Sequence, residues 1–181
     1  MPAPALPPRT APPVAVLQPV GRPSTLGLEV LRGQAFWLRL LNDVRSATTS
    51  VIASTLAFDN PDLHGLLERQ LRASAGFTVQ LVVDRKGYED RTWKHQRPRL
   101  LRLQSLGATV CLASGLRAQG RYHSKVVVID RRIAYVGGAN LTYASRDHKE
   151  AVTRFTGPPV AAALRMLTED MSAPSTKEGI N

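Results

Sequence analysis

The chain has 181 residues, with 24 Lys and Arg against 14 Asp and Glu, a formal net charge of +10 and a pI near 10.6. This basic excess favours a polyanionic partner, either nucleic acid or an acidic membrane surface. The single cysteine, Cys111, excludes an internal disulfide, and no apolar stretch is long enough to form a membrane-spanning helix.

The composition divides the chain into three parts. Residues 1–27 are rich in Pro and Ala and contain no acidic side chain, so a flexible segment is expected there. This segment lacks the apolar core of a secretory signal, while Arg9 and Arg22 without acidic neighbours leave organelle targeting open. Residues 28–172 suffice for one hydrophobic core and are predicted to form a single domain, and residues 173–181 are predicted to form a tail.

The predicted elements alternate between helices and strands. Apolar residues recur at broadly helical spacing from Leu28 to Val44, which predicts a first helix. A strand over 50–58 follows, and Asn60 or Asp62 is expected to cap a helix over 63–73. The later elements are strands over 77–83 and 108–112 on either side of a helix that ends at 100–106, strands over 126–129, 133–136 and 151–155, and a helix over 159–171.

This order predicts an α/β sandwich with a mixed β-sheet and helices on both faces. Cys111 falls in the apolar strand over 108–112, which indicates a buried thiol. An unpaired buried cysteine favours a reducing intracellular compartment.

The segment from His123 to Asp130 carries the most chemical information. Because side chains alternate along a strand, His123 and Lys125 are expected to point to the same face. The short link between the strands over 126–129 and 133–136 predicts a hairpin, although it lacks the Asn-Gly or Asp-Gly pair that favours one.

Such a hairpin would bring Gly137, Gly138 and Asn140 beside His123 and Lys125. Glycines let the backbone approach a ligand closely, and successive N–H groups can form a concavity that binds anions. Taken singly, each of these residue types has an ordinary structural explanation, but their fixed spacing points to a phosphate site.

At these residues the chain resembles the phospholipase D superfamily, whose signature is His-x-Lys-(x)4-Asp-(x)6-Gly-[Gly/Ser]-x-Asn. The fixed positions are occupied by His123, Lys125, Asp130, Gly137, Gly138 and Asn140. Many members have Ser where Gly138 stands, so a hydroxyl contact from that position is absent here. Glu150 falls where many members carry a glutamate that orients the nucleophilic histidine, although the spacing after the Asn varies.

The resemblance implies displacement at phosphorus, with His123 forming a covalent phosphohistidine and a second histidine protonating the leaving oxygen. It also implies that Lys125 and Asn140, together with Gly137 and Gly138, bind the phosphate, and that Glu150 or else Asp130 orients the imidazole. No metal ion or other cofactor takes part in this scheme.

The signature occurs only once in this chain. The other histidines, His64, His95 and His148, lack the accompanying Lys and Asp. Single-copy members resemble half of the two-copy enzymes and complete the site in a symmetric dimer, so a homodimer with a shared active site is predicted. The alternative is that the chain is one half of a longer two-copy enzyme.

Basic residues concentrate after the strand over 77–83 and around the motif. They are predicted to follow a nucleic-acid backbone, with Tyr88, Trp93 and His95 as candidates for base stacking, although Trp93 alone more simply packs inward. The basic residues are Arg85, Lys86, Arg91, Lys94, Arg97, Arg99, Arg102, Arg117, Arg121, Arg131 and Arg132.

The sequence thus predicts a metal-independent phosphodiesterase. The basic charge, the short single-copy form and the lack of an evident membrane anchor favour an endonuclease acting on DNA or RNA. Two alternatives stay open: a phospholipase or cardiolipin hydrolase at an anionic membrane, and a nucleic-acid-binding protein whose motif is unused.

Overall fold

The structure, a computed structural model, describes residues 26–89, 94–115 and 120–172. The segments expected to be flexible therefore lie outside the described residues, apart from Leu26 and Gly27. The elements are β1 (Leu28–Arg32), α1 (Gly33–Arg45), β2 (Ser50–Thr55), α2 (Pro61–Ala73), β3 (Thr78–Asp84), α3 (Arg85–Glu89), α4 (Gln96–Ser105), β4 (Thr109–Ala113), β5 (Val126–Ile129), β6 (Ile133–Gly137), the 3-10 helix η2 (Tyr143–Arg146), β7 (Ala151–Thr156) and α5 (Pro159–Ser172).

The strands form one mixed sheet in the order β1-β7-β6-β5-β2-β3-β4. Strands β2, β3 and β4 are parallel to one another. The pairs β2–β5, β5–β6, β6–β7 and β7–β1 are antiparallel. The carboxyl ends of β2 and β3 therefore lie at the same end of the sheet as the amino end of β5, where the signature residues begin. None of the helices in the described ranges is long and apolar enough to cross a bilayer.

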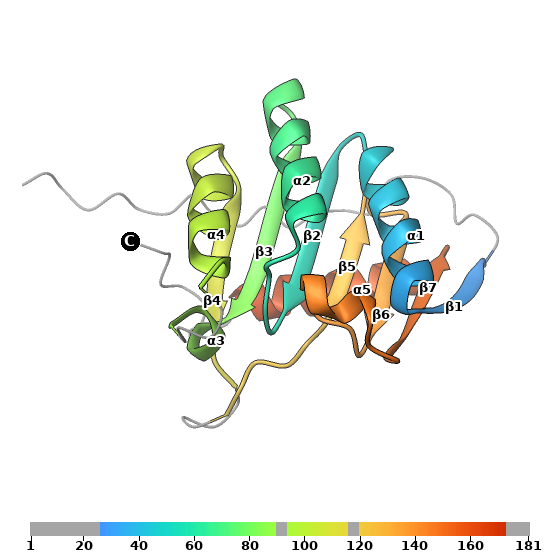
Figure 1. The fold of residues 1–181 in the computed structure, drawn as a ribbon. Coiled ribbons are helices and arrows are strands. Elements are labelled where there is room, and N and C mark those ends of the chain that lie inside the picture. The colour runs from blue at the N-terminus through green and yellow to red at the C-terminus, as the bar shows by residue number, and fades with distance from the viewer. Residues whose placement is uncertain (1–25, 90–93, 116–119, 173–181) are drawn as a thin grey trace, which may run out of the picture.

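Helices cover both faces of the sheet, as predicted (Figure 1). Helices α1, α2 and α4 pack on one face, where α1 contributes the buried side chains Phe36, Trp37, Leu40, Leu41 and Val44. Helix α5 packs on the other face through Val160, Ala163, Leu164, Leu167 and Met171. Each helix packs an apolar stripe against the sheet, so a hydrophobic cluster fills the space on each of the two sheet faces.

The prediction of one helix from Leu28 to Val44 is wrong at its start. Residues 28–32 form the edge strand β1, which pairs with β7 in a register that places Leu28 opposite Phe155 and Val30 opposite Thr153. Gly33 has a φ of 52°, a conformation that glycine adopts without strain, and α1 begins there. The structure also adds the short helices α3 and η2, which the sequence did not predict.

Other boundaries agree closely with the sequence pattern. Asn60, rather than Asp62, caps α2, because its Oδ1 accepts hydrogen bonds of 3.0 Å from the backbone N–H groups of Asp62 and Leu63. Strand β2 ends at Thr55, and Phe58 instead forms an isolated parallel bridge with Leu141. Cys111 on β4 is a free, half-buried thiol, and burial raises its pKa.

The hairpin between β5 and β6 is present. Asp130 and Arg131 have φ values of 51° and 56°, and the N–H of Arg132 donates to the carbonyl of Ile129 at 2.9 Å. Positive φ at both central residues is the feature of a type I′ turn, whose twist suits a hairpin. The turn therefore forms although neither central residue is glycine.

A charged network fastens the sheet edge to α1. Arg154 on β7 donates to Asp43 of α1 at 2.7 Å and to Glu29 of β1 at 2.9 Å. The hydroxyl of Tyr135 on β6 also donates to Asp43, at 2.6 Å. Because Arg154 is only 8% exposed, the network joins four elements at a largely enclosed point.

Candidate active site

His123 and Lys125 lie in the extended segment that leads into β5, just before the strand begins. The Lys125 Nζ is 2.9 Å from His123 Nδ1 and donates to the His123 carbonyl oxygen at 3.0 Å. The imidazole is exposed, whereas Lys125 is only 8% exposed. The structure thus brings the two side chains together, as their spacing predicts, and leaves the ring open to solvent.

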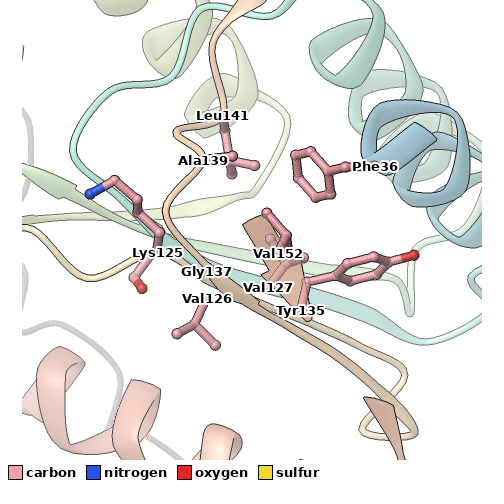
Figure 2. Close-up of a pocket in the computed structure, with 10 residues that line it drawn as sticks. Phe36, Lys125, Val126, Val127, Tyr135, Gly137, Ala139, Leu141 and Val152 are labelled. Carbon is pink, nitrogen blue, oxygen red and sulfur yellow. The ribbon is translucent and has the colours of Figure 1, made fainter. Parts of the chain in front are cut away.

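The Lys125 side chain lines one edge of a void of about 10 Å³, which is otherwise walled mainly by apolar side chains that include Phe36, Val127 and Val152. In Figure 2 the Lys125 ammonium points away from these side chains. Burial lowers the pKa of Lys125, and the nearby Glu150 carboxylate opposes this shift. The void is too small for a substrate, so a phosphodiester must approach from the exposed side of His123.

Close packing excludes a side chain at Gly137 and crowds one at Gly138. A Cβ atom at Gly137 would lie 2.4 Å from the Ala151 carbonyl oxygen, and one at Gly138 would lie 3.3 Å from the Glu150 Cβ. Their N–H groups donate to the carbonyls of Lys125 (3.3 Å) and Ala151 (3.0 Å). The expectation that these two N–H groups form an anion-binding concavity is therefore wrong, because the sheet already uses them.

Asn140 and Glu150 each present a buried oxygen without a hydrogen-bond partner, Oδ1 and Oε2 respectively. The loop at Asn140 is fixed beside the end of β2, because the N–H of Leu141 donates to Thr55 Oγ1 at 3.1 Å. Unpartnered buried polar atoms are costly, and both of these oxygens are acceptors, so each can take a hydrogen bond from a donor that enters the site. Because the end of β2 at Thr55 lies beside the start of β5, Asn140 is at the same end of the sheet as Lys125.

Glu150 packs against Gly138 and interacts electrostatically with Lys125. Its Oε2 is 3.6 Å from His148 Nδ1, and this exposed histidine was not assigned to the site from sequence. The expected contact between Glu150 and the His123 imidazole is absent from the interactions of the described residues. Glu150 is thus placed in the site, next to Lys125 rather than on the nucleophile.

Asp130 does not belong to this site, contrary to the sequence-based assignment. It follows β5, so the whole strand separates it from His123. Its carboxylate accepts hydrogen bonds from the N–H groups of Thr48, Thr49 and Ser50 at 2.8, 2.8 and 2.9 Å, and also from both threonine hydroxyls. Asp130 fastens the β5–β6 hairpin to the start of β2, and the imidazole lies at the opposite end.

Residues on both sides of His123 are held by contacts that sequence reasoning missed. The N–H of Tyr122 donates to Asp84 Oδ1 at 2.6 Å, and the Tyr122 hydroxyl donates to Asp170 on α5. The Ser124 hydroxyl lies 2.9 Å from that of Ser54 on β2. The one signal in the sequence was Asp84 itself, an acidic residue directly after the apolar run of β3.

The comparisons with known proteins identify the family. Residues 40–171 match the family model described as "Cardiolipin synthase, PLD-like domain". The chain belongs to the phospholipase D superfamily. A cardiolipin synthase of Staphylococcus aureus is 28% identical over 163 residues, which cover 82% of this chain and 33% of that protein. This phospholipase D-like chain thus spans about a third of the length of the curated relatives it matches.

Solved structures show the same fold. The phospholipase D family member Nuc from Salmonella typhimurium superimposes with a TM-score of 0.71 at 18% identity, covering 86% of this chain and 99% of that chain. NucT from Helicobacter pylori gives a TM-score of 0.70 at 24% identity, with the same coverage. These matches confirm the predicted α/β sandwich of the phospholipase D-like domain.

The phospholipase D-like domain does not gather all the predicted nucleic-acid contacts at one place. Arg131 and Arg132 lie at the Asp130 end, where they line a hollow of about 320 Å³ with Thr48 and Thr49. Arg91, Trp93 and Arg117 lie outside the described residues. Arg131 and Arg132 flank the motif in sequence but lie away from His123, so the prediction that they follow a nucleic-acid backbone close to the site is wrong.

Several other basic residues have structural partners. Arg121 pairs with Asp84 at 3.1 Å, Arg102 pairs with Glu68 at 3.0 Å, and Arg99 donates to the Asp59 carbonyl. The same region carries Arg85, Lys86, Lys94 and Arg97 on or beside α3 and α4.

The candidates for base stacking differ in exposure. Tyr88 packs against the core, and the Arg97 guanidinium lies 5.6 Å from the centre of its ring, so the expected stacking role is not supported. His95 is exposed at the start of α4 and stays a candidate. Among the described residues, no three His, Cys, Asp or Glu side chains are grouped to hold a metal ion.

Proposed function

We propose that this chain is a phosphodiesterase that cleaves DNA or RNA through a phosphohistidine on His123. The observation that carries the proposal is the exposed imidazole whose Nδ1 lies 2.9 Å from the ammonium of the buried Lys125. An ammonium beside a ring nitrogen suits a phosphate, because it can hold a non-bridging oxygen next to the nucleophile.

The chemistry follows from this geometry. In the resting site the Lys125 ammonium faces His123 Nδ1, so the proton of a neutral ring resides on Nε2. A phosphate oxygen that binds the ammonium frees Nδ1, and the ring proton then moves from Nε2 to Nδ1. The Nε2 lone pair then attacks phosphorus, the N–P bond forms and the P–O bond to the leaving oxygen breaks.

Charge builds on the non-bridging oxygens as the bond to phosphorus forms. Lys125 neutralises part of this charge, and the NH2 group of the Asn140 amide donates a hydrogen bond to a non-bridging oxygen. The leaving oxygen needs a proton from a second imidazole, which later activates water to hydrolyse the phosphohistidine. Water then restores His123, and no oxidation or reduction takes place.

The second imidazole is proposed to be His123 of another copy, in a symmetric homodimer. An exposed apolar row beside the site supports this pairing. It consists of Leu26, Leu28 and Val30 on and before β1 and Val136 on β6, and we call it the β1 face. Leu28 is 62% exposed and Val30 is 68% exposed.

The register shows that the β1 face is continuous. Val30 and Val136 both pair with Thr153 of β7, so their side chains lie in one row on the same side of the sheet. Val136 directly precedes Gly137, so this row reaches the site. Exposed apolar patches of this kind mark interaction surfaces, and a nucleic-acid backbone has no attraction to them.

Nucleic acid is the preferred substrate because of the net charge of +10 and the basic residues on α3 and α4 near the same end of the sheet. The second candidate is a phospholipid phosphodiesterase, favoured by the similarity to cardiolipin synthase.

One assay separates these functions. The protein is incubated in excess EDTA with a labelled single strand, with a plasmid and with cardiolipin vesicles, beside the His123→Ala variant. We expect cleavage of nucleic acid by the wild type, at least 10³-fold slower turnover by the variant, and binding that weakens steeply with salt. The protein–phosphorus adduct, trapped at alkaline pH, should be absent from the variant.

The alternatives give different results. Turnover of cardiolipin while nucleic acid stays intact assigns the lipid function. Nucleic-acid binding without turnover, and without any effect of His123→Ala, contradicts an enzyme and leaves a binding protein. A matching unfolding temperature of the two proteins shows that lost turnover is not lost folding.

A further inference from the structure

Asp84 is the one acidic residue in the described ranges that is fully enclosed, at 0% exposure, and the chemistry above does not use it. It is the last residue of β3 and lies at the same end of the sheet as His123. A buried carboxylate is costly unless hydrogen bonds compensate for its lost hydration. Its position therefore calls for an explanation.

Three donors surround the Asp84 carboxylate. Oδ1 accepts from the N–H of Tyr122 at 2.6 Å, and Oδ2 accepts from the N–H of Gly87 at 2.6 Å and from Arg121 Nη1 at 3.1 Å. Two of these donors belong to the residues directly before His123. The short distances are typical of hydrogen bonds to an ionised acceptor.

The backbone at His123 has few other supports. In the part described between Ala113 and Val126, the connection from β4 to β5 contains no helix or strand, so side-chain contacts must fix its path. Asp84 holds Tyr122 on one side of His123, and Ser54 holds Ser124 on the other. The imidazole is left exposed on a backbone that is fastened at both neighbours.

We propose that Asp84 is a positioning residue for the nucleophile: its carboxylate fixes the backbone that presents His123 to phosphorus. Arg121 then serves to neutralise this carboxylate rather than to bind the nucleic-acid backbone. The proposal rests on the phosphohistidine function, since only an in-line attack demands a fixed ring. In an Asp84→Asn variant one carboxylate oxygen is replaced by an NH2 group. In either orientation of the amide, this group would face an N–H donor of Tyr122 or of Gly87 and Arg121.

The test compares Asp84→Asn with Asp130→Asn. Both variants remove a carboxylate that accepts backbone N–H groups, but Asp130 lies at the opposite end of β5. We expect both to lower the unfolding temperature, and only Asp84→Asn to lower kcat, by about 100-fold with KM changed less than about 2-fold. A loss of kcat that both variants share equally would overturn the positioning role.

A second measurement does not depend on turnover. Long-range ¹H–¹⁵N spectra report the tautomer and hydrogen bonding of the His123 ring. We expect the wild type and Asp130→Asn to share one set of His123 signals, with Nδ1 hydrogen-bonded, and Asp84→Asn to lose it. Unchanged His123 signals in a folded Asp84→Asn protein contradict the proposal, even if no phosphodiester is cleaved by any form.

Arg121→Gln covers the case in which Asp84→Asn does not fold. If Arg121 neutralises Asp84, this variant should lower kcat about 10-fold and leave the salt dependence of nucleic-acid binding unchanged. A phosphate contact would instead reduce the slope of log K against log salt by about 1. That reduction, with an unaltered kcat, would assign Arg121 to the substrate and overturn its role beside Asp84.

Discussion

At the residue scale, two aspartates accept hydrogen bonds from backbone N–H groups and so hold neighbouring chain segments together at the ends of strands. Asp84 does so next to the nucleophile, and Asp130 does so where the β5–β6 hairpin meets β2. Burial raises the pKa of Asp130, but hydrogen bonds from Ser50, Thr48 and Thr49 together outweigh it, so the net shift is downward. The ionised form is therefore stabilised in the folded chain.

We predict that Asp130→Asn lowers the free energy of unfolding by about 2 kcal/mol at pH 7. A carboxyl whose pKa is lower in the folded state adds stability above its unfolded pKa and loses it as pH falls through the folded pKa. The difference between wild type and variant should therefore shrink below about pH 4. Urea unfolding at pH 7 and pH 3 measures this, and an equal difference at both values would contradict it.

The sequence predicted which residue types form the site better than it predicted their roles. The spacing of His123 and Lys125 placed the two side chains together, because local extended geometry determines their contact. It could not show that Asp130 lies at the far end of β5, since that depends on which strand ends meet. Asp84 was missed because its partners come from a segment distant in sequence.

At the element scale, the edge of the sheet is held by one charged network rather than by apolar packing alone. Arg154 of β7 joins Asp43 of α1 and Glu29 of β1, and Tyr135 of β6 joins Asp43. The Arg154 and Asp43 side chains are 10% and 11% exposed. Removal of one partner therefore leaves a nearly buried charge without compensation.

We predict that Arg154→Met lowers the free energy of unfolding by about 3 kcal/mol. The matched control is Arg72→Met, which removes an arginine that is 52% exposed from its pair with Glu68 on α2 and should cost less than about 0.5 kcal/mol. Denaturant unfolding of the two variants measures both values. Equal losses would show that the network adds nothing beyond a surface ion pair.

Most helices and strands were predictable because their apolar runs are local signals, as in β5 and the inward stripe of α1. Strand β1 was not predictable, because Leu28 and Leu31 fit a helical spacing. Its pairing partner β7 lies more than a hundred residues later in the sequence, so no local pattern reveals the pairing. The short helices α3 and η2 carry too few residues to show a period.

At the scale of the whole molecule, the two ends of the sheet have different tasks. One end holds the hairpin through Asp130, and the other holds His123, Lys125, Glu150 and Asp84. The β1 face adjoins the second end through Val136. Glu29 of β1 points to the opposite side, toward Arg39 and Arg154, whereas the exposed Arg32 follows Val30 on the same side of β1. A proposed second copy on this face would cover exposed apolar area and supply the missing imidazole together.

We predict that Val30→Asp converts the proposed dimer to a folded monomer with at least 100-fold lower turnover, because a charge on the β1 face opposes its burial. Leu38→Asp is the matched control, since Leu38 is a 55% exposed leucine on α1 outside the β1 face, and the dimer should persist. Sedimentation and turnover measure both variants.

Mixing subunits tests the shared site directly. If each phosphate needs His123 from both copies, an equal mixture of wild type and His123→Ala retains about a quarter of the activity, because only the wild-type pairs are competent. If His148 of the same copy instead protonates the leaving oxygen, the mixture retains about half and His148→Ala abolishes turnover. A fully active Val30→Asp monomer would also contradict the shared site, because it would show that one copy completes the reaction without a partner on the β1 face.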